Sequence, residues 1–356
     1  MGHGQVALSS MEARSTRQIG PQTWVPQTEE NSLFVSPWHS GYALGVAAAK
    51  EGFLHDALFY SGDAEYVSSI EPFLRAGLAA DEPILVVVQP QKIALLRDAI
   101  GSDADKIVFK SMNEIGRNPG RIIAAWRDFV SQQATPTRAV RGIGEPVWPQ
   151  RSADELTECH QHESLLNVAF GDGTPWSLMC PYDIDALEPS VLDDARRTHP
   201  YLVEAGERSC NAAYDAGTAD IWLSAPLPAP PPHAWCLSFD AELLRTARMS
   251  LLRFARATGL SEARVADLVL AVNEIASNSV AHGAGSGTLT LWTDQGSVIC
   301  EVYDTGHLTD PLAGRRKPDP REAGGRGLWL ANELSDLTQL RRSPAGTRIR
   351  LHFSLD

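Results

Sequence analysis

Hydrophobic and polar positions along residues 52–222 form a repeating pattern that predicts strands and helices in alternation. Short runs rich in branched apolar residues, bounded by turn residues, predict buried strands, and the longer segments between them carry apolar residues at helical spacing. The predicted strands are Asp56–Ser61, Ile84–Gln89, Ile107–Lys110, Arg138–Ile143 and Trp176–Pro181, and the predicted helices are Ala64–Ala79, Pro90–Ile100, Pro119–Gln133 and Ser152–Phe170. The alternation predicts an α/β domain with a mostly parallel sheet and helices on both faces.

Ligands of such sheets bind beyond the carboxyl ends of the strands. The candidate ligand-binding segments at that edge are Ser61-Gly62-Asp63, Gly144-Glu145 and Cys180-Pro181-Tyr182-Asp183. The sequence contains no Gly-x-x-x-x-Gly-Lys-Ser/Thr motif, so it predicts no phosphate-binding loop of that kind.

The run Cys159-His160-Gln161-His162 places three potential metal ligands on one predicted helix. Helical neighbours one or two positions apart point in different directions, and only spacings of three or four converge. We therefore interpret the run as structural. Whether Cys180 and His199 meet in the fold is left open by the sequence.

A proline-rich segment, Ala225–Pro232, separates this pattern from a different one. Such segments are extended and semi-rigid. A short strand near Ala234–Phe239, an amphipathic helix at about Ala241–Thr258 and alternating strands at Val298–Tyr303 and Arg348–Phe353 follow it. We expect a disordered tail at 1–45, an α/β domain at 46–222, a linker at 223–234 and an α+β domain at 235–356.

The helical pattern at Leu270–Gly283 places Glu274 and Asn278 four residues apart, on one face of the helix. A neighbouring stripe of Leu268, Val272, Ile275 and Ser279 would bury the helix and present Glu274, Asn278 and His282 to a cleft. The alternative is that the pair lies on an ordinary solvated face.

Three further elements follow in order. Asp304-Thr305-Gly306 closes a strand, and the polar, arginine-rich segment from His307 to Ala323 is typical of a loop or lid. Gly324–Gly327 opens a helical pattern at Leu328–Leu334, where free backbone amides and the helix dipole could hold phosphate, and Gly346-Thr347 precedes the last strand. Taken singly, these are also the features of strand-end turns and flexible linkers.

In this order, the motifs of about residues 236–356 resemble the ATP-binding domain of the GHKL superfamily, most of all its anti-sigma-factor serine/threonine kinase branch, typified by RsbW. The resemblance implies a Bergerat-type α+β sandwich that uses ATP and Mg²⁺. Glu274 would be the general base, and Asn278 would ligate Mg²⁺. Asp304 would accept a hydrogen bond from the adenine amino group, with Gly306 and Thr347 beside it. Gly325, Arg326 and Gly327 would contact the phosphates.

Two features of the sequence bear on which branch of the GHKL superfamily the chain resembles. Relatives are expected to carry a lid arginine just before the glycines, where this chain has Ala323; Arg321 or Arg326 could substitute. A non-catalytic ATP-gated binding protein is therefore one alternative. A histidine kinase needs a helical hairpin with a phosphoacceptor histidine, and there is no room for it after the linker, where His233 lies in the proline run. A sensor kinase acting on a histidine of another protein is the weaker alternative.

Residues 52–217 resemble the MEDS sensory domain. The resemblance rests on Tyr60-Ser61-Gly62, on Arg141 with the block Glu163–Asn167, on Cys180–Asp183 and on His199-Pro200. It implies a sensory pocket, for which we nominate Arg141, Glu163, Tyr182 and Asp183; Arg141 and Glu163 form either a structural ion pair or part of that pocket. The combined arrangement resembles RsbA-type anti-sigma regulators, which implies a sigma factor and a STAS-type antagonist as partners.

Composition agrees with an ordinary soluble protein of two domains, with 356 residues of which 43% are hydrophobic and 21% charged. Residues 236–356 contain 14 basic and 14 acidic side chains, so the net charge of −13 arises in residues 1–235 and argues against direct nucleic-acid binding. There is no membrane-length apolar run and no export signal. The five cysteines fit reduced thiols, and we expect a cytoplasmic protein. The sequence identifies neither the signal that the N-terminal domain senses nor the oligomeric state, for which a homodimer is one option.

Overall fold

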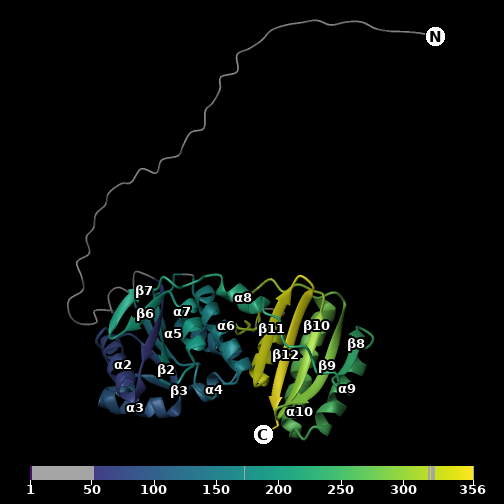
Figure 1. Ribbon diagram of the computed structural model, residues 1–356, viewed down its shortest axis with the longest axis horizontal. Helices are drawn as coiled ribbons and strands as arrows, with labels where there is room; N and C mark the ends of the chain where they lie inside the picture. The colour runs from purple at the N-terminus through teal and green to yellow at the C-terminus, as the bar shows by residue number, and fades with distance from the viewer. Residues whose placement is uncertain (2–51, 172, 320, 322–324, 356) are drawn as a thin grey trace. The chain divides into compact units, whose positions relative to one another are not determined.

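The computed structural model describes Met1 and residues 52–171, 173–319, 321 and 325–355. The predicted tail at 1–45 lies, apart from Met1, outside these residues, as do Ala323 and Gly324. Figure 1 shows the two parts of the described chain, an N-terminal one in purple to teal and a C-terminal one in green to yellow.

The N-terminal domain is built on a seven-stranded sheet in the order β3-β2-β4-β5-β1-β6-β7. All neighbouring pairs are parallel except β6 and β7. Its strands are β1 (Phe53–Tyr60), β2 (Ile84–Val88), β3 (Val108–Ser111), β4 (Val140–Gly144), β5 (Trp176–Asp183), β6 (Tyr201–Glu204) and β7 (Glu207–Cys210). Its helices are α2 (Gly62–Ala79), α3 (Pro90–Ile100), α4 (Met112–Ile115), α5 (Ile122–Gln133), α6 (Ala153–Ala169), α7 (Pro189–Thr198) and α8 (Thr218–Ser224), with short 3-10 turns at Gly101–Lys106 and Pro119–Arg121.

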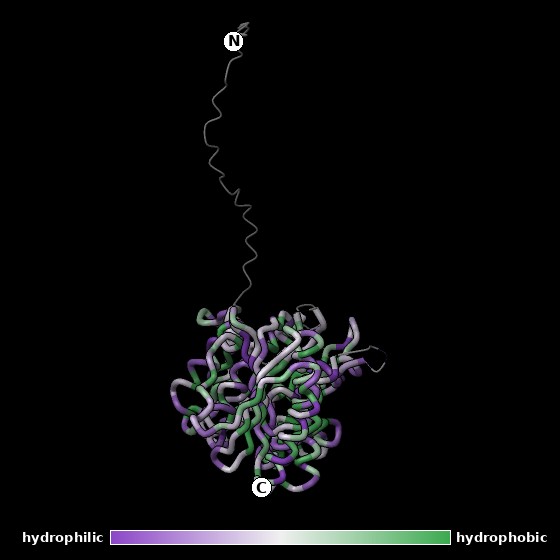
Figure 2. The backbone as a smooth tube through the Cα atoms, turned by 90° about the vertical axis from the view of Figure 1, so that its right-hand side faces the viewer, coloured by the Kyte–Doolittle hydropathy of each residue, from purple (hydrophilic) through white to green (hydrophobic). Residues whose placement is uncertain are grey.

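Both faces of this sheet are covered, as the sequence predicted. Helices α2 and α3 bury Tyr66, Phe73 and Leu96 on one face, whereas α5 to α8 bury Trp126 and their other apolar residues on the other. Figure 2, which looks onto the C-terminal side of the molecule, shows hydrophobic segments mostly toward the middle and hydrophilic ones mostly along the outer loops. The α/β fold class is therefore confirmed for this domain.

The C-terminal domain has a five-stranded antiparallel sheet in the order β11-β12-β10-β9-β8. Its strands are β8 (Trp235–Asp240), β9 (Ser286–Asp294), β10 (Ser297–Asp304), β11 (Leu337–Ser343) and β12 (Gly346–Ser354), and its helices are α9 (Leu244–Ala257), α10 (Glu262–Ala281) and α11 (Arg326–Leu334). One apolar core joins helices and sheet, with Leu268, Val272 and Phe353 at its centre. This is the α+β sandwich that was expected.

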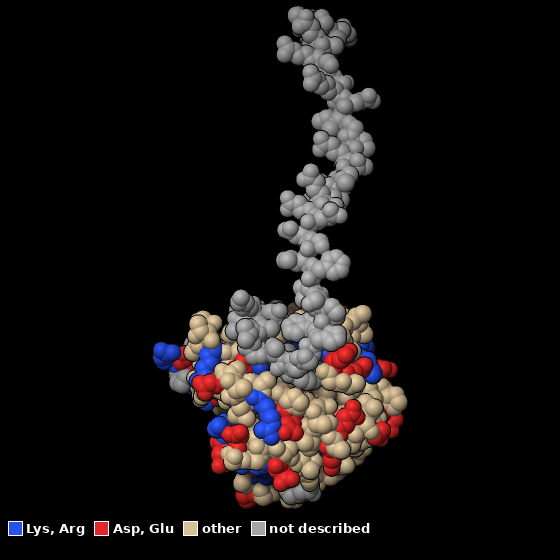
Figure 3. Space-filling view, turned by 90° about the vertical axis from the view of Figure 1, so that its left-hand side faces the viewer, with Lys and Arg blue, Asp and Glu red and all other residues tan. Residues whose placement is uncertain are grey.

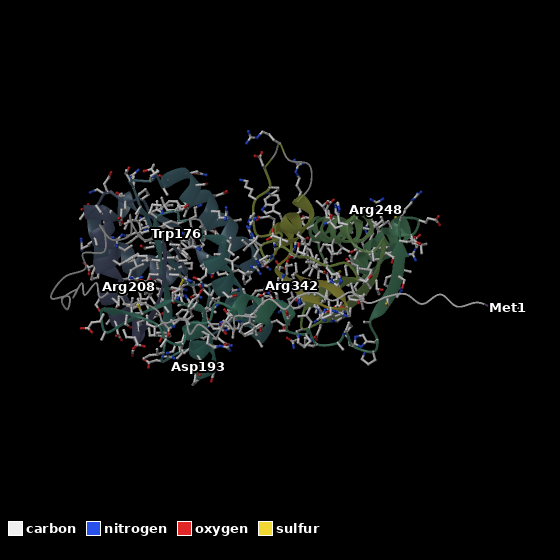
Figure 4. The ribbon with its side chains drawn as sticks, turned by 90° about the horizontal axis from the view of Figure 1, so that it is seen from above. Met1, Trp176, Asp193, Arg208, Arg248 and Arg342 are labelled. Atoms are coloured by element: carbon white, nitrogen blue, oxygen red, sulfur yellow. The ribbon has the colours of Figure 1, made fainter. Side chains whose placement is uncertain are left out.

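The two domains share a polar contact whose centre is buried. The Asn118 side-chain amide donates to the Asn332 carbonyl at 3.0 Å and to Thr338 Oγ1 at 3.1 Å. Glu158, fully buried on α6, accepts from Arg341 at 2.6 Å. Figure 4 shows Arg342 at the same boundary, where it pairs with Asp220 of α8. The two domains are therefore joined by a direct contact as well as by the proline-rich segment.

Figure 3, which looks onto the N-terminal domain, shows Asp and Glu interspersed with Lys and Arg and no extended basic surface on the face it draws. Among the described residues, no helix is both long and apolar enough to cross a membrane.

Candidate functional site

Helix α10 positions Glu274 and Asn278 from its buried side. Ser261 caps the helix by accepting from the Arg264 amide at 3.3 Å, a standard N-terminal cap. The buried residues of α10 recur at helical spacing, and Glu274 and Asn278, which are both half-buried, lie beside that stripe. The pair therefore lies on the rim of the core and faces a cavity.

Asp304, the last residue of β10, is fixed by two donors. Ser279 Oγ donates to Asp304 Oδ2 at 2.5 Å, and the Gly306 amide donates to Asp304 Oδ1 at 2.8 Å. Each carboxylate oxygen keeps a further lone pair for a ligand. A side chain at Gly306 would lie 2.6 Å from the Gly283 Cα, so glycine allows the turn to close against the end of α10.

Thr347 lies directly opposite Asp304 in the antiparallel β10–β12 pair. Its hydroxyl donates to the Gly306 carbonyl at 2.8 Å and accepts from the Leu308 amide at 3.3 Å. One side chain thus fixes the start of the segment that follows Asp304.

Helix α11 begins at the same cavity. Gly325 caps it in the left-handed conformation, with a φ of 71°. At Gly327 a Cβ atom would lie 2.6 Å from Asn278 Nδ2, so a side chain at this position would displace the Asn278 amide. Arg326 lies in that turn and lines the cavity. Free amides at a helix start attract anions.

The cavity has a volume of about 870 Å³, and all eight residues nominated from the sequence line it: Glu274, Asn278, Asp304, Gly306, Gly325, Arg326, Gly327 and Thr347. Their common location is a finding, and their individual roles remain predictions. The lining also includes Ser279, His282, Gly283, Arg316 and Lys317.

Sequence reasoning missed part of this lining. Ser279 was assigned to the buried stripe, whereas its hydroxyl orients Asp304. A serine on an otherwise apolar stripe was the available signal. Arg316 and Lys317 belong to the cationic run of the predicted lid and line the cavity, where they bring positive charge. Arg316 lies 3.8 Å from Asp310, and Lys317 lies 3.5 Å from Asp128.

The predicted lid is partly anchored. Leu312 is buried in the core of the N-terminal domain, and Arg315 is almost fully buried. Arg315 donates to Gln161 Oε1 of α6 at 2.7 Å and to the Pro119 carbonyl at 3.3 Å. Burial lowers the pKa of Arg315, and it raises that of the neighbouring Glu158 against the pull of Arg341 and Arg315.

Of the two substitutes for the lid arginine, Arg321 is 89% exposed at its side chain and pairs with Asp319 at 2.8 Å, whereas Arg326 lines the cavity. Ala323 itself lies outside the described residues.

The donor set fits a Mg²⁺-nucleotide. Glu274 and Asn278 offer side-chain oxygens, the ligand type that Mg²⁺ prefers while it keeps several waters. Asp304 offers a fixed acceptor at the other side of the cavity, and α11 offers backbone donors. The arrangement can bind an adenine nucleotide and hold an attacking hydroxyl near a carboxylate.

The structure does not bring all four residues nominated as a sensory pocket together: Glu163 and Tyr182 interact, whereas Arg141 lies elsewhere. Arg141 pairs with Glu82 and donates to the Phe73 carbonyl at 3.0 Å, on the face of the sheet that α2 covers. Glu163 lies on the other face, so the expected pairing of Arg141 with Glu163 is wrong. The residues are separated because β4 and α6 present them to opposite sides of the sheet.

Glu163 instead meets His55, Cys180 and His199, so Cys180 and His199 do approach each other in the fold. Tyr182 packs edge-on against His199, with ring centroids 5.6 Å apart. Asp183 accepts from the Asp185 amide at 3.1 Å. His55 was not singled out from the sequence, because one histidine in an apolar strand carries no spacing signal.

The residues of the Cys159–His162 run diverge as expected. Cys159 donates to the Pro146 carbonyl at 3.2 Å, His160 stacks on Trp222, and Gln161 accepts from Arg315. At the nominated strand ends, Tyr60 donates to Glu145 at 2.9 Å and accepts from Lys92 at 2.8 Å. Burial raises the pKa of Glu145 to about 7.

Comparison with known proteins assigns both halves. Residues 54–200 match the MEDS family (MEthanogen/methylotroph, DcmR Sensory domain), and residues 237–353 match the histidine kinase-like ATPase domain. A crystal structure of the RsbU and RsbW domains of a Mycobacterium tuberculosis protein is similar at 22% identity and a TM-score of 0.27, over 35% of this chain. This chain spans 33% of the length of that one.

Proposed function

We propose that this chain, a MEDS sensory domain followed by a histidine kinase-like ATPase domain, is a Mg²⁺-ATP-dependent serine/threonine kinase that regulates transcription. Its substrate would be a STAS-type antagonist, and its second partner would be a sigma factor. The single observation that carries the proposal is the 870 Å³ cavity, around which a carboxylate, a carboxamide, a fixed acceptor and a glycine-flanked helix start converge.

Each group has a definite task. Asp304 accepts from an exocyclic amine, and it disfavours guanine, which presents a carbonyl at that position. Asn278 supplies an amide oxygen to Mg²⁺, which neutralises charge on the phosphates. Glu274, one helical turn earlier, orients and deprotonates the attacking hydroxyl. Phosphoryl transfer asks mostly for such alignment and charge neutralisation.

The identity of substrate and partner rests on the resemblance of the sequence to anti-sigma regulators. Phosphorylation would inactivate the antagonist and leave the ATPase domain free to hold its sigma factor.

Control by the sensory domain is supported by the contacts of the lid. Arg315 and Lys317 follow Gly314, which lines the cavity, and they bind Gln161 and Asp128 of the sensory domain. A change in the sensory domain that moves α6 would therefore move the lid. Such control requires a signal that distinguishes the docked from the undocked state.

A non-catalytic ATP-gated binding protein is the second candidate. It is favoured by the pairing of Arg321, one of the two candidate substitutes for the lid arginine, with Asp319. In that case nucleotide would order the lid and alter partner binding without transfer.

The test compares three variants of the full chain. With radiolabelled ATP and a STAS-domain substrate, Glu274→Gln should lower the rate of transfer by about 100-fold or more while ATP binding persists. Asn278→Ala should weaken binding of Mg²⁺-ATP itself. Asn273→Ala is the matched control, because Asn273 is an equally exposed α10 residue that lines a different surface hollow.

Two results would count against the kinase. Nucleotide binding without any transfer by the wild type supports the ATP-gated binder. Transfer at the wild-type rate by Glu274→Gln leaves Glu274 as a solvated helix residue and removes it as the base.

A further inference from the structure

Four buried side chains with metal-binding atoms converge inside the sensory domain. His55 lies on β1, Glu163 on α6 and Cys180 on β5, and His199 lies two residues before β6. All four are at most 1% exposed, and their ligand atoms all lie within 4.8 Å of one another. Four separate elements thus bring together two imidazoles, a thiol and a carboxylate.

Four of the six distances between these atoms lie close to the edges of a coordination tetrahedron. Glu163 Oε2 lies 3.1 Å from His55 Nε2 and 3.4 Å from His199 Nε2. Cys180 Sγ lies 3.5 Å from both His55 Nε2 and Glu163 Oε2. Bonds of about 2.0–2.3 Å from zinc to nitrogen, oxygen and sulfur give tetrahedral edges of about 3.3–3.8 Å.

Hydrogen bonds on the far side of each imidazole fix which nitrogen faces the cluster. His199 Nδ1 lies 2.8 Å from the Ala195 carbonyl, which can only accept, so Nδ1 carries the hydrogen. His55 Nδ1 lies 3.1 Å from Asn167 Oδ1, whose amide nitrogen donates to the Thr198 carbonyl at 2.8 Å. In the neutral rings, both Nε2 lone pairs therefore point toward Glu163. Outer-shell carbonyl oxygens orient metal-binding histidines in this way.

The cluster has too few hydrogens for its acceptors. Two imidazole lone pairs and the two oxygens of a carboxylate converge, whereas the Cys180 thiol and the Tyr182 hydroxyl beside Glu163 can supply one hydrogen each. Among the described residues, His199 Nε2 and Glu163 Oε1 have no hydrogen-bond partner. Acceptors buried face to face are costly unless a cation lies between them. A divalent ion held by a thiolate, a carboxylate and two neutral imidazoles also makes a set with no net charge.

We propose that His55, Glu163, Cys180 and His199 bind one divalent transition-metal ion, with Zn²⁺ as the best match. Mixed nitrogen, sulfur and oxygen donors in a tetrahedron are typical of zinc, whereas Mg²⁺ and Ca²⁺ take oxygen ligands. Four protein ligands close the coordination sphere, so the site is structural or regulatory and not hydrolytic. Binding releases the Cys180 thiol proton to solvent.

The site is separate from the nucleotide cavity, but the helix that carries Glu163 also contacts the ATPase domain. Glu163 belongs to α6, and so do Gln161 and Glu158, which bind Arg315 and Arg341 of the ATPase domain. Occupancy of the metal site therefore sets the position of a helix that the ATPase domain contacts.

The experiment uses the untagged full chain, unfolded in chelator and refolded with Zn²⁺ or Co²⁺ as the only metal. We expect one ion per chain by elemental analysis. The cobalt form should show the strong visible absorption of tetrahedral Co²⁺ and a thiolate-to-metal charge-transfer band. Cys180→Ser should lose that band, and His199→Gln should weaken binding by about 100-fold or more, since even outer-shell changes cost 10–100-fold.

Two further variants sharpen the test. Cys159→Ser is the matched control, because Cys159 is an equally buried thiol of the same domain that donates to the Pro146 carbonyl outside the cluster. It should bind metal as the wild type does. Asn167→Ala, which removes the partner of His55, should weaken binding by about 10–100-fold.

The wild-type cobalt spectrum decides the matter even where a variant does not fold. A wild type that takes up no ion, or takes it up without the thiolate band, overturns the proposal. Uptake that is unchanged in Cys180→Ser does the same.

Discussion

In the proposed site, Asp304 is the carboxylate that recognises the base. Its oxygens are oriented by Ser279 and the Gly306 amide and face the cavity. Asp304→Asn places an amide donor where an acceptor is needed. We expect ATP affinity to fall by about 10–100-fold, the range for a hydrogen bond to a charged group, with weak GTP binding unchanged. Calorimetry measures both, and Asp294→Asn, on the exposed end of β9, serves as the control. Equal affinities for ATP and GTP in the wild type would contradict the assignment.

Glu145 gives a second residue-scale prediction, for stability against pH. Burial raises its pKa from 4.5 to about 7, with Lys92 opposing and Asp183 and Asp63 adding to the rise. The folded state therefore holds a proton that the unfolded state has lost. This contribution to stability is complete below about pH 4.5 and is lost as the pH rises through about 7.

Glu145→Gln should remove that pH dependence. Relative to the wild type, the variant should gain about 1–3 kcal/mol in the free energy of unfolding between about pH 5 and pH 8. Urea unfolding followed by tryptophan fluorescence measures the difference. Glu114→Gln, at an exposed position of the same domain, should follow the wild type. A difference of the opposite sign would mean that Glu145 is ionised in the folded protein at neutral pH.

At the scale of elements, the first turn of α11 depends on close approach to α10. A Cβ at Gly327 would lie 2.6 Å from the movable end of the Asn278 side chain and 3.3 Å from Glu274 Cβ. Gly327→Ala should displace Asn278 and weaken Mg²⁺-ATP binding by about 10-fold or more, while alanine favours the helix by up to about 1 kcal/mol. Binding and thermal unfolding separate these effects. The control is Gly171→Ala, where a Cβ meets only its own helix at 3.7 Å. Unchanged binding would place Asn278 outside the site.

Several elements could be predicted because local signals agree with the fold. The predicted Pro90–Ile100 helix has the bounds of α3, and Ser152 with Glu155 forms the capping box that begins α6. The β6–β7 hairpin was missed. Its strands are four residues each, and its turn uses Ala205 and Gly206, both at positive φ, where alanine gives no turn signal.

At the scale of the whole molecule, the features that the sequence could not predict are contacts between residues far apart in the chain. The residues of the nucleotide cavity belong to motifs that follow one another in a set order within one domain. The family pattern therefore predicts that they line one cavity. The proposed metal site joins His55 of β1 to His199, which lies two residues before the neighbouring strand β6, and the domain contact joins Asn118 to Asn332. Neither set of residues forms a motif with a fixed spacing in the sequence, because both depend on strand order and on docking. The misassigned pairing of Arg141 failed for the same reason: one face of a sheet cannot be told from the other in a fully buried strand.

Separating the domains tests whether the contact transmits a signal. The ATPase domain has its own sheet and apolar core, so deleting residues 1–224 should leave a folded, nucleotide-binding fragment. The deletion also removes the partners of Arg315 and Arg341. We therefore expect the fragment to bind ATP with an affinity that metal depletion no longer changes, whereas depletion should shift the affinity of the full chain.

Calorimetry of both proteins, with and without bound metal, measures this shift. The comparison includes full-length Cys180→Ser, which should behave as metal-depleted protein under all conditions. A coupling of about 5-fold or more in affinity would correspond to about 1 kcal/mol between the two sites. If the fragment is insoluble, or if the full chain binds ATP equally with and without metal, then α6 serves as a scaffold and the lid contacts do not carry the signal.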